Sequence, residues 1–314
     1  MNLAFIAMRL GGVVIGDQVR APGPGRSAKS RSLVVTLAPH LRSGVMVYDH
    51  ATTDQIGSWV YACDKIGLSS TPMDAGRRDW KPSPRDTAAA EAKRLKAKAD
   101  EAGRSQRALS IWYASRSPYG TPVERYLVEE RGLALPPEAA GATLRFHPAC
   151  PFNGERVPAM VALVRDIATD RPIAVHRTAL DQDGRKVVVE GADRLSCGPI
   201  KGGAIKLTPA DAVGDTLAVG EGIESVLSMR HLPGVEVRSV WSLIAARGVE
   251  TFPVLPGVAA LWLAVDHDAD GLHASDTCAA RYRQAGVDTH MVVPREPGTD
   301  LNDLIKIRAG GDDV

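Results

Sequence analysis

The sequence predicts an α/β protein: a small parallel-sheet domain, preceded by a mixed α+β domain and a small N-terminal hairpin module. From residue 215 onward, apolar runs alternate with helix-forming segments, which is typical of parallel strands joined by crossover helices. Between residues 144 and 207, short β-branched runs are separated by turn signals, which favours an antiparallel sheet. Two apolar runs at 33–37 and 44–48 predict a hairpin near the N-terminus.

The individual elements are expected where the apolar periodicity changes and where Gly or Pro interrupts the chain. Strands are predicted at 33–37, 44–48, 144–147, 160–165, 173–178, 186–190, 204–207, 216–220, 236–241, 260–265 and 287–293. Helices are predicted at 3–10, 59–66, 87–115, 122–130, 223–231, 272–285 and 301–308. Residues 70–85, rich in Pro, Asp and Arg, indicate a linker. We therefore expect four parts, at 1–70, 71–118, 119–210 and 211–314.

Composition limits the class of protein. Of 314 residues, 44% are hydrophobic and 24% are charged, as in an ordinary soluble globular protein. No window approaches about 18 uninterrupted apolar residues, so no membrane span is expected. The first residues carry no cationic leader, so we expect a cytoplasmic protein. The four cysteines form no Cys-x-x-Cys pair, which argues against a zinc cluster and against a disulfide framework.

Charge is distributed unevenly along the chain. The net charge is +1, but residues 1–120 carry 18 basic and 10 acidic side chains, whereas residues 211–314 carry 8 basic and 16 acidic ones. A basic front, which includes Arg26, Lys29 and Arg31, and an acidic end suit a polyanion bound by one part and a cation bound by the other. The alternative is that the two regions merely solvate two faces.

Acidic residues follow two of the predicted parallel strands. The apolar run that begins at Leu261 leads into Asp266, Asp268 and Asp270, and an earlier apolar run leads into Glu221. Carboxylates this close repel one another unless a cation lies between them. The carboxyl ends of strands are also where open α/β sheets place their sites. Because hard oxygen ligands suit Mg²⁺, we predict a magnesium site here.

Two other interpretations of the acidic cluster compete with a magnesium site. Its Asp-x-Asp-x-Asp-Gly pattern is that of an EF-hand loop, but that loop needs Glu at its twelfth position, where this chain has Thr277. Acids also cap helices that follow strands. Capping explains one Asp readily, but it explains three of them together with Glu221 less well.

The acidic segments resemble those of the Toprim domain, which topoisomerases, bacterial-type primases and certain nucleases share. The similar segments are Val219-Gly-Glu221-Gly-Ile-Glu224-Ser, Val265-Asp-His-Asp-Ala-Asp-Gly271 and Gly298-Thr-Asp300-Leu-Asn-Asp303. The last of these looks like the Asp-x-Asn-Asp element of phage and mobile-element primases. The resemblance implies catalytic carboxylates at Glu221, Asp266 and Asp268 that hold Mg²⁺ or Mn²⁺. Asp270 would help to hold the metal, and Asp300 and Asp303 are secondary candidates.

The middle of the chain resembles the segment that precedes Toprim in these primases. Residues 120–132 contain a Tyr-Leu…Arg-Gly element, and further similarity extends over 145–203. In that architecture the segment faces Toprim across a groove, and its basic residues contact template or nucleotide phosphates. The resemblance implies nucleotide or nucleic-acid binding by Arg145, His147, Arg177, Lys186 and Lys201, with secondary candidates in the front loop at Arg26, Lys29 and Arg31.

The N-terminus departs from the primase pattern. These primases begin with a zinc ribbon whose ligands form a Cys-Pro-x-His and a Cys-x-x-Cys pair, but here Ala21-Pro-Gly-Pro24 and Tyr48-Asp-His-Ala51 stand in the comparable places. The thiolates of a structural zinc site are missing, so no zinc is expected. We interpret residues 1–70 as a degenerate ribbon-like module, held together by Leu33, Val35, Val45 and Val47.

The resemblance implies a primase-like, metal-dependent nucleotidyltransferase that makes short primers on single-stranded DNA during replication of a mobile element. The expected partners are single-stranded DNA, nucleoside triphosphates and a separate replicative helicase. Two alternatives stay open: a Toprim-type nuclease, which would use the same carboxylates, and a non-enzymatic nucleic-acid-binding accessory protein, which the missing zinc ligands favour. A topoisomerase is not expected, because none of the six tyrosines has a setting for that chemistry.

Overall fold

The computed structural model describes residues 2–39, 41, 43–68 and 84–311. Contacts divide the chain into two compact units, Met1–Ala89 and Ala90–Val314. Most of the linker predicted at 70–85 lies outside the described residues. The four finer parts predicted from the sequence stay a prediction. None of the described helices is long and apolar enough to cross a membrane.

The N-terminal unit is an antiparallel sheet covered by two helices. Its strands lie in the order β1-β2-β3-β4. The elements are α1 (Leu3–Leu10), β1 (Val13–Ile15), β2 (Gln18–Ala21), β3 (Leu33–Leu37), β4 (Val45–Asp49) and α2 (Gln55–Ile66). The predicted hairpin is present as β3 and β4, which pair in register. A second hairpin, formed by β1 and β2, was not predicted from the sequence, because its strands are only three and four residues long. Three of the four predicted core residues, Leu33, Val35 and Val45, are fully buried.

The buried carboxylate of Asp49 links residues 21–24 with residues 48–51, the two segments that stand in the places of the primase zinc ligands. Asp49 is only 1% exposed and accepts hydrogen bonds from the Ala51 amide (3.0 Å) and the Ser58 hydroxyl (3.3 Å). Its Oδ2 atom lies so close to Gly23 that a Cβ there would collide with it. Burial by itself raises the pKa of Asp49, but hydrogen bonds from Ala51, Ser32 and Ser58 outweigh burial and hold that pKa below its usual value.

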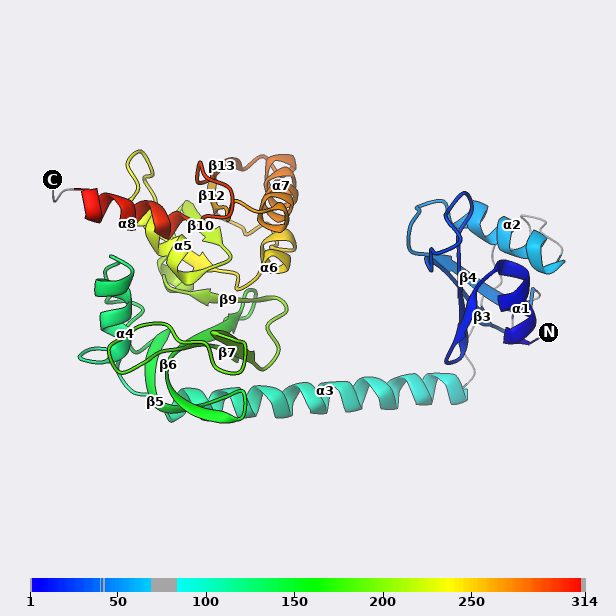
Figure 1. The fold of residues 1–314 in the computed structure, drawn as a ribbon, viewed down its shortest axis with the longest axis horizontal. Helices are drawn as coiled ribbons and strands as arrows, with labels where there is room; N and C mark the ends of the chain where they lie inside the picture. Colours follow the sequence, from blue (N-terminus) through cyan, green and yellow to red (C-terminus); the bar gives the residue numbers. More distant parts are fainter. Residues whose placement is uncertain (1, 40, 42, 69–83, 312–314) are drawn as a thin grey trace. The chain divides into compact units, whose positions relative to one another are not determined.

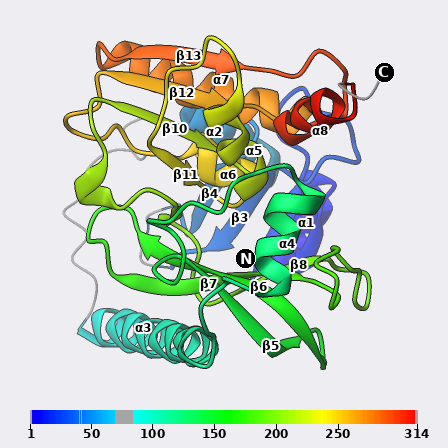
Figure 2. The same cartoon turned by 90° about the vertical axis from the view of Figure 1, so that its left-hand side faces the viewer.

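The second unit contains one mixed sheet of nine strands. Its order is β13-β12-β10-β11-β9-β6-β7-β8, with β5 paired to β6. The strands are β5 (Leu144–Phe152), β6 (Glu155–Asp166), β7 (Pro172–Ala179), β8 (Arg194–Cys197), β9 (Gly203–Lys206), β10 (Thr216–Gly220), β11 (Val240–Ser242), β12 (Ala260–Ala264) and β13 (Asp288–Val292). Strands β10 to β13 are parallel (Figure 2). Strand β9 pairs with β11 on one side and β6 on the other, and so joins them to the antiparallel strands β5 to β8.

Helices cover both faces of this sheet. They are α3 (Pro84–Tyr113), α4 (Pro122–Arg125), the π-helical turn η2 (Tyr126–Glu130), the 3₁₀ turns η3 (Ala210–Ala212) and η4 (Met229–His231), α5 (Ile223–Ser228), α6 (Ala246–Glu250), α7 (Ala269–Gln284) and α8 (Leu301–Gly311). Figure 1 shows α6 and α7 on one side of the parallel strands and α5 on the other. Leu217 and Val219 of β10 pack in the core that includes α6 and α7, whereas Ala218 packs with α5. Burial on both faces explains why these strands are apolar throughout.

The antiparallel strands also have two covered faces. Val161, Leu163 and Val175 pack against the C-terminal part of α3, and we call this side the α3 face (Figure 1). The alternate residues Met160 and Ala162 share a core with α5, and we call this side the α5 face. Because side chains alternate along a strand, neighbouring residues of β6, β7 and β8 belong to opposite faces.

One predicted strand of this unit is wrong. Residues 186–190 form no strand, since Lys186 and Val189 make only isolated bridges. Strand β8 instead begins at Arg194 and occupies the edge beside β7. Three consecutive valines favour a strand by propensity, but Glu190 adopts a left-handed backbone with φ of 47° and turns the chain. Tertiary pairing therefore overrode local preference at this point.

Asp49→Asn is expected to destabilise the N-terminal unit by about 1–3 kcal/mol, because it weakens the buried hydrogen-bond acceptor. The pKa of Asp49 is lower in the folded chain than in the unfolded chain. Its stabilisation is therefore present above the unfolded pKa and is lost as the pH falls through the folded value, so the variant should lose this pH dependence. Hydrogen–deuterium exchange of β3, β4 and α2 in the full chain measures the effect.

The matched control for this experiment is Asp64→Asn, which changes an exposed acid of α2. It should exchange like the wild type at every pH. Equal protection of β3 and β4 in Asp49→Asn and the wild type would contradict the role assigned to the buried carboxylate.

Candidate active site

Glu221 and Asp266 follow the ends of neighbouring parallel strands. Strand β10 ends at Gly220 and β12 ends at Ala264, and these two residues are paired in register. Glu221 follows Gly220 directly and Asp266 follows Ala264 by two positions, so both lie beyond the same edge of the sheet. This edge is the carboxyl edge of the parallel strands.

The loop after β12 holds its acids by local hydrogen bonds. Asp266 Oδ1 accepts a bond from the Ser225 hydroxyl of α5 (3.2 Å). Asp268 Oδ1 accepts one from the Gly271 amide (2.7 Å) and so caps α7. The turn needs glycine at 271, because a Cβ there would lie 2.5 Å from the Asp266 carbonyl oxygen. Helix capping therefore accounts for one oxygen of Asp268 but not for Asp266 or Glu221.

The carboxylates at this edge repel one another. Burial raises the pKa of Glu221, and the charges of Asp266 and Asp268 raise it further, while Arg194 opposes them. Burial also raises the pKa of Asp266, to which Asp300 and Asp268 add. We call Glu221, Asp266 and Asp268 the carboxylate cluster. A cation bound among them would relieve the repulsion.

The loop before α8 lies beside the carboxylate cluster. Its backbone is joined to the Asp266–Asp268 loop, because His267 exchanges hydrogen bonds with Thr299 (3.1 Å) and Gly298 (2.8 Å). Asp300 and Asp303 cap the start of α8 reciprocally, since each side chain accepts from the other's amide at 3.1 Å. Asp300 thus serves as a helix cap whose charge also reaches the cluster.

The donor set fits a hard divalent cation such as Mg²⁺ or Mn²⁺. The cluster offers carboxylate oxygens, which such ions prefer, and burial together with mutual repulsion raises the pKa values of Glu221 and Asp266. Asp270, also predicted to help, lies exposed in the first turn of α7. Within the described ranges, no three His, Cys, Asp or Glu side chains converge closely enough to enclose an ion. The chemistry is therefore suitable, although the oxygens are not gathered around one point.

A buried polar network lies behind the cluster and joins three segments of the chain. Glu224 of α5 is 6% exposed and accepts a hydrogen bond from the Tyr126 hydroxyl at 2.5 Å. Arg131 donates to the same hydroxyl (3.1 Å) and to Asn302 of α8 (3.4 Å). Asn302, fully buried, donates in return to the Arg131 carbonyl (2.8 Å). The network therefore fixes α5, which carries Ser225, against the η2 turn and α8.

The charge of Glu224 is maintained by its partners. Burial by itself raises the pKa of Glu224, but Arg194, the bond from Tyr126 and the charge of Arg131 outweigh it and leave the pKa below its usual value. Burial and the Glu224 charge raise the pKa of Tyr126, so this residue stays a neutral donor. Glu224, Tyr126 and Arg131 all lie in motifs that can be recognised in the sequence. The periodicity of the sequence does not indicate that their side chains are in contact.

Comparison with protein-family models assigns two parts of the chain. Residues 216–311 match the Toprim domain, and residues 102–207 match a domain of unknown function, DUF7146. The C-terminal region is a Toprim domain. Its parallel sheet carries the carboxylate cluster at the carboxyl edge, and the region matching DUF7146 supplies β5 to β8 together with Tyr126 and Arg131.

Solved primase structures are similar to this chain at low sequence identity. The primase fragment of the bacteriophage T7 primase-helicase protein is 17% identical, and the match covers 63% of this chain and 72% of that chain with a TM-score of 0.38. The Aquifex aeolicus primase, with its zinc-binding and RNA polymerase domains, is 14% identical, with 98% and 80% coverage and a TM-score of 0.36. A comparison with curated protein sequences gives no match.

Two of the predicted basic residues are engaged within the protein. Arg177 is 8% exposed, and its guanidinium donates to the carbonyls of Pro151 and Leu195. Arg145 donates to Gly141 (2.8 Å), and its guanidinium lies 4.3 Å from the ring centroid of Trp112. Neither guanidinium is directed by these contacts to the Toprim carboxylates.

The other three predicted basic residues differ in their surroundings. His147 is buried, accepts a bond from the Ala149 amide (3.1 Å) and has a pKa lowered by burial. Lys186 forms a 2.8 Å ion pair with Asp193. Lys201 is exposed in the turn before β9. The binding roles of these residues stay predictions.

The basic front loop belongs to the N-terminal unit. Arg26 donates to the Ala51 carbonyl (2.6 Å), and Arg31 donates to the carbonyls of Ala28 (2.9 Å) and Ser30 (2.7 Å). Lys29 is exposed. Arg31 therefore braces its own loop, Arg26 joins that loop to the segment after β4, and nucleic-acid binding by the loop stays a prediction.

Arg194 is a site residue that the sequence interpretation missed. Its charge lowers the pKa values of Glu221, Glu224 and Asp266. The residue lies in β8, which was not predicted, so no signal placed it on a particular face of a sheet.

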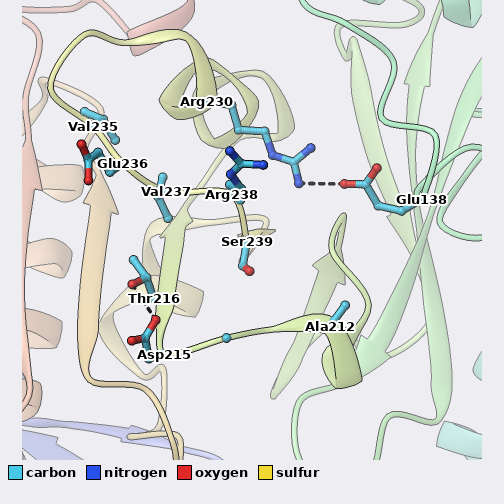
Figure 3. A pocket seen from close by; sticks show the side chains of 11 residues that line it. Glu138, Ala212, Asp215, Thr216, Arg230, Val235, Glu236, Val237, Arg238 and Ser239 are labelled. Carbon is cyan, nitrogen blue, oxygen red and sulfur yellow. Dashed lines mark hydrogen bonds and ion pairs between the residues drawn. The ribbon is translucent and has the colours of Figure 1, made fainter.

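A separate recess opens at the other end of the parallel strands. Its volume is about 1010 Å³, and its lining includes Asp215 and Ser239, which precede β10 and β11 (Figure 3). Arg230 donates to Glu138 at 2.9 Å in its wall. Because the recess lies at the amino ends of the strands, it is not part of the Toprim carboxylate cluster.

Tyr126→Phe is expected to lower the unfolding temperature at neutral pH, because it removes the hydrogen bond to the buried Glu224 carboxylate at a cost of about 1–3 kcal/mol. The pKa of Glu224 is depressed in the folded chain. Its stabilisation is thus present above the unfolded pKa and is lost as the pH falls, so the difference from wild type should shrink in acid. Thermal unfolding across pH tests this, with Tyr119→Phe, at an exposed tyrosine, as the control.

Glu221→Gln is expected to raise the unfolding temperature by about 2–4 °C in the absence of divalent metal, because it removes one repelling carboxylate. The pKa of Glu221 is higher in the folded chain than in the unfolded one. Repulsion therefore destabilises the fold at neutral pH and disappears as the pH falls, so the gain should vanish in acid.

The same experiment tests metal binding. Mg²⁺ or Mn²⁺ should raise the unfolding temperature of the wild type more than that of Glu221→Gln. Asp276→Asn, at an exposed acid of α7, should behave like the wild type throughout. An equal response of Glu221→Gln and the wild type to metal would remove Glu221 from the proposed ligand set.

Proposed function

We propose that this chain is a primase-like, metal-dependent nucleotidyltransferase that makes short primers on single-stranded DNA in the replication of a mobile element. The observation that supports it is the carboxylate cluster at the carboxyl edge of a Toprim sheet, with the charge of Arg194 acting on the same acids. Acids that suit cations, beside an arginine that suits phosphate, are the requirements of phosphoryl transfer.

The residues of the cluster have separable roles in this proposal. Glu221, Asp266 and Asp268 would hold Mg²⁺ or Mn²⁺, which supplies charge neutralisation at the triphosphate and lowers the pKa of the attacking hydroxyl. The Ser225 hydroxyl orients Asp266, and the cap at Gly271 orients Asp268. Glu221, at the end of β10, would also accept the proton of the primer 3′-hydroxyl.

The proposed partners are anionic. They are single-stranded DNA as the template and nucleoside triphosphates as substrates, with a separate helicase to expose the template. Residues 1–120 carry a charge of +8, from 18 basic and 10 acidic side chains, which favours binding of DNA backbone. Template binding should therefore weaken steeply as the salt concentration rises.

Incubation of the full chain with single-stranded DNA, labelled nucleoside triphosphates and Mg²⁺ or Mn²⁺ tests the function directly. We expect new short oligomers. Shortened DNA without new oligomers would indicate the nuclease alternative, and DNA binding with neither product would indicate the accessory-protein alternative. Both of these outcomes would overturn the proposal.

The double variant Asp266→Asn, Asp268→Asn is expected to reduce oligomer synthesis by at least about 100-fold, because it removes two ligand charges from the reacting centre. The amide at 268 keeps an oxygen that can cap α7, so the fold is preserved better than with alanine. Asp276→Asn on the same helix should retain full activity. Undiminished synthesis by the double variant would show that these acids are not catalytic.

A further inference from the structure

The turn after β11 contains a residue in a strained backbone conformation. Ile244 has a φ of 76°, and among the described residues with positive φ it is the only β-branched one. A β-branched side chain in this region crowds the neighbouring carbonyl. The Ala245 amide donates to the Leu243 carbonyl at 2.9 Å, which closes a three-residue γ-turn around Ile244. A γ-turn with φ of about +75° is rare and strained, so its surroundings must impose it.

The strained turn holds the main chain of Glu221. The Ile244 amide donates to the Glu221 carbonyl at 3.0 Å, and the Ser242 hydroxyl donates to the same oxygen at 2.7 Å. The Leu243 amide donates to the Gly220 carbonyl at 2.8 Å. These two carbonyls belong to the peptide planes before and after the Glu221 Cα atom. Because φ and ψ are rotations between adjoining planes, fixing both planes fixes the direction in which the Glu221 side chain leaves the backbone.

The side chains of the turn are anchored in two cores. Leu243 is buried in the core that includes α6 and α7, whereas Ile244 is partly buried against the core that includes α5. Helix α6 also packs directly against the turn, because a Cβ at Gly248 would collide with the Leu243 carbonyl oxygen. Packing on both sides therefore leaves the turn little room to relax.

Glycine would meet the backbone requirement at position 244 better than isoleucine does, because glycine adopts positive φ without steric cost. The presence of isoleucine indicates that its side chain contributes something that offsets the strain. Its contact with the core that includes α5 is such a contribution, since α5 also carries Ser225, whose hydroxyl bonds Asp266. Ile244 thus connects the backbone of one proposed metal ligand with the helix that orients another.

We propose that Ile244 is a positioning residue that holds Glu221 in the orientation required for metal binding. Its strained turn supplies the amides that fix the two peptide planes, and its packed side chain keeps the turn from relaxing. A ligand that is oriented beforehand binds a metal more tightly than a mobile one. This inference deepens the proposed function and rests on it, because Glu221 is a metal ligand only in that proposal.

The experiment measures Mn²⁺ binding to the full chain by electron paramagnetic resonance. Ile244→Gly permits the left-handed backbone but removes the side chain, Ile244→Ala removes the side chain and keeps the strain, and Ile244→Val keeps a β-branched side chain. Ile167→Gly is the matched control. Ile167 is also a partly buried isoleucine in a turn, but its amide donates to the Gly202 carbonyl (2.9 Å) and its φ is not positive. Each variant is made with Glu221 and with Glu221→Gln, and circular dichroism establishes folding.

Ile244→Gly is expected to weaken Mn²⁺ binding about tenfold, the size of effect found for residues that orient metal ligands. Ile244→Ala should lose at least as much, because the strain then has no anchor to hold it. Ile244→Val and Ile167→Gly should bind Mn²⁺ like the wild type. Combined with Glu221→Gln, Ile244→Gly should cause little further loss, because Ile244 acts through Glu221. A merely structural role would lower the affinity equally in both backgrounds.

Hydrogen–deuterium exchange provides a second measurement that needs no metal. The amides of residues 243 and 244 should exchange faster in Ile244→Gly and Ile244→Ala than in the wild type or in Ile244→Val. Unchanged protection of these amides would contradict the anchoring role of the side chain. Unchanged Mn²⁺ binding by the two truncated variants, or an equal loss with Glu221 and with Glu221→Gln, would overturn the inference.

Neither measurement depends on primer synthesis, so the two proposals can fail separately. If the wild type made no oligomers but Ile244 and Glu221 were coupled in Mn²⁺ binding, the proposed function would fail and the positioning role would stand. If the wild type made oligomers and the coupling were absent, the function would stand and the positioning role would fail. A wild type that bound no Mn²⁺ would overturn both.

Discussion

The repulsion among carboxylates at the end of the Toprim sheet is the constraint on which the rest of the structure depends. Glu221 and Asp266 meet because β10 and β12 are paired and end together. Neighbouring groups reduce the cost: the Ser225 hydroxyl bonds Asp266, and the charge of Arg194 opposes the raised pKa of Glu221. The repulsion that remains uncompensated gives the cluster an affinity for cations. Unfavourable interactions of this kind are retained where function needs them.

The buried network around Glu224 determines how the segment matching DUF7146 is joined to the Toprim domain. A buried carboxylate is strongly destabilising without its partners, and here the partners come from η2 and α8 as well as from α5. Strand β9 adds a continuous sheet between the two parts. Removing either connection would leave polar groups unpaired, so the arrangement around the cluster is specified by hydrogen bonds as well as by apolar packing.

Much of the fold could be predicted because it depends on local patterns. The alternation after residue 215 reflects strands buried on both faces and amphipathic helices, and it predicted β10, β12, β13, α5, α7 and α8. The strand predicted at the valine-rich stretch 186–190 is wrong for the opposite reason. A strand needs a free edge to pair with, and the edge of β7 is occupied by β8. Short elements such as β1 and α6 carry too few residues to produce a recognisable period.

The sequence by itself determined which acids the Toprim domain carries and at which end of its sheet they stand, because residues after parallel strands share one edge whatever else surrounds them. Tertiary structure alone decided which basic and polar groups meet those acids. Arg194 and Arg177 are both arginines in neighbouring strands, but the pairing of β7 with β8 puts them on opposite faces. Tyr126 and Glu224, 98 positions apart, meet because separate segments pack together, and that contact leaves no period in the sequence.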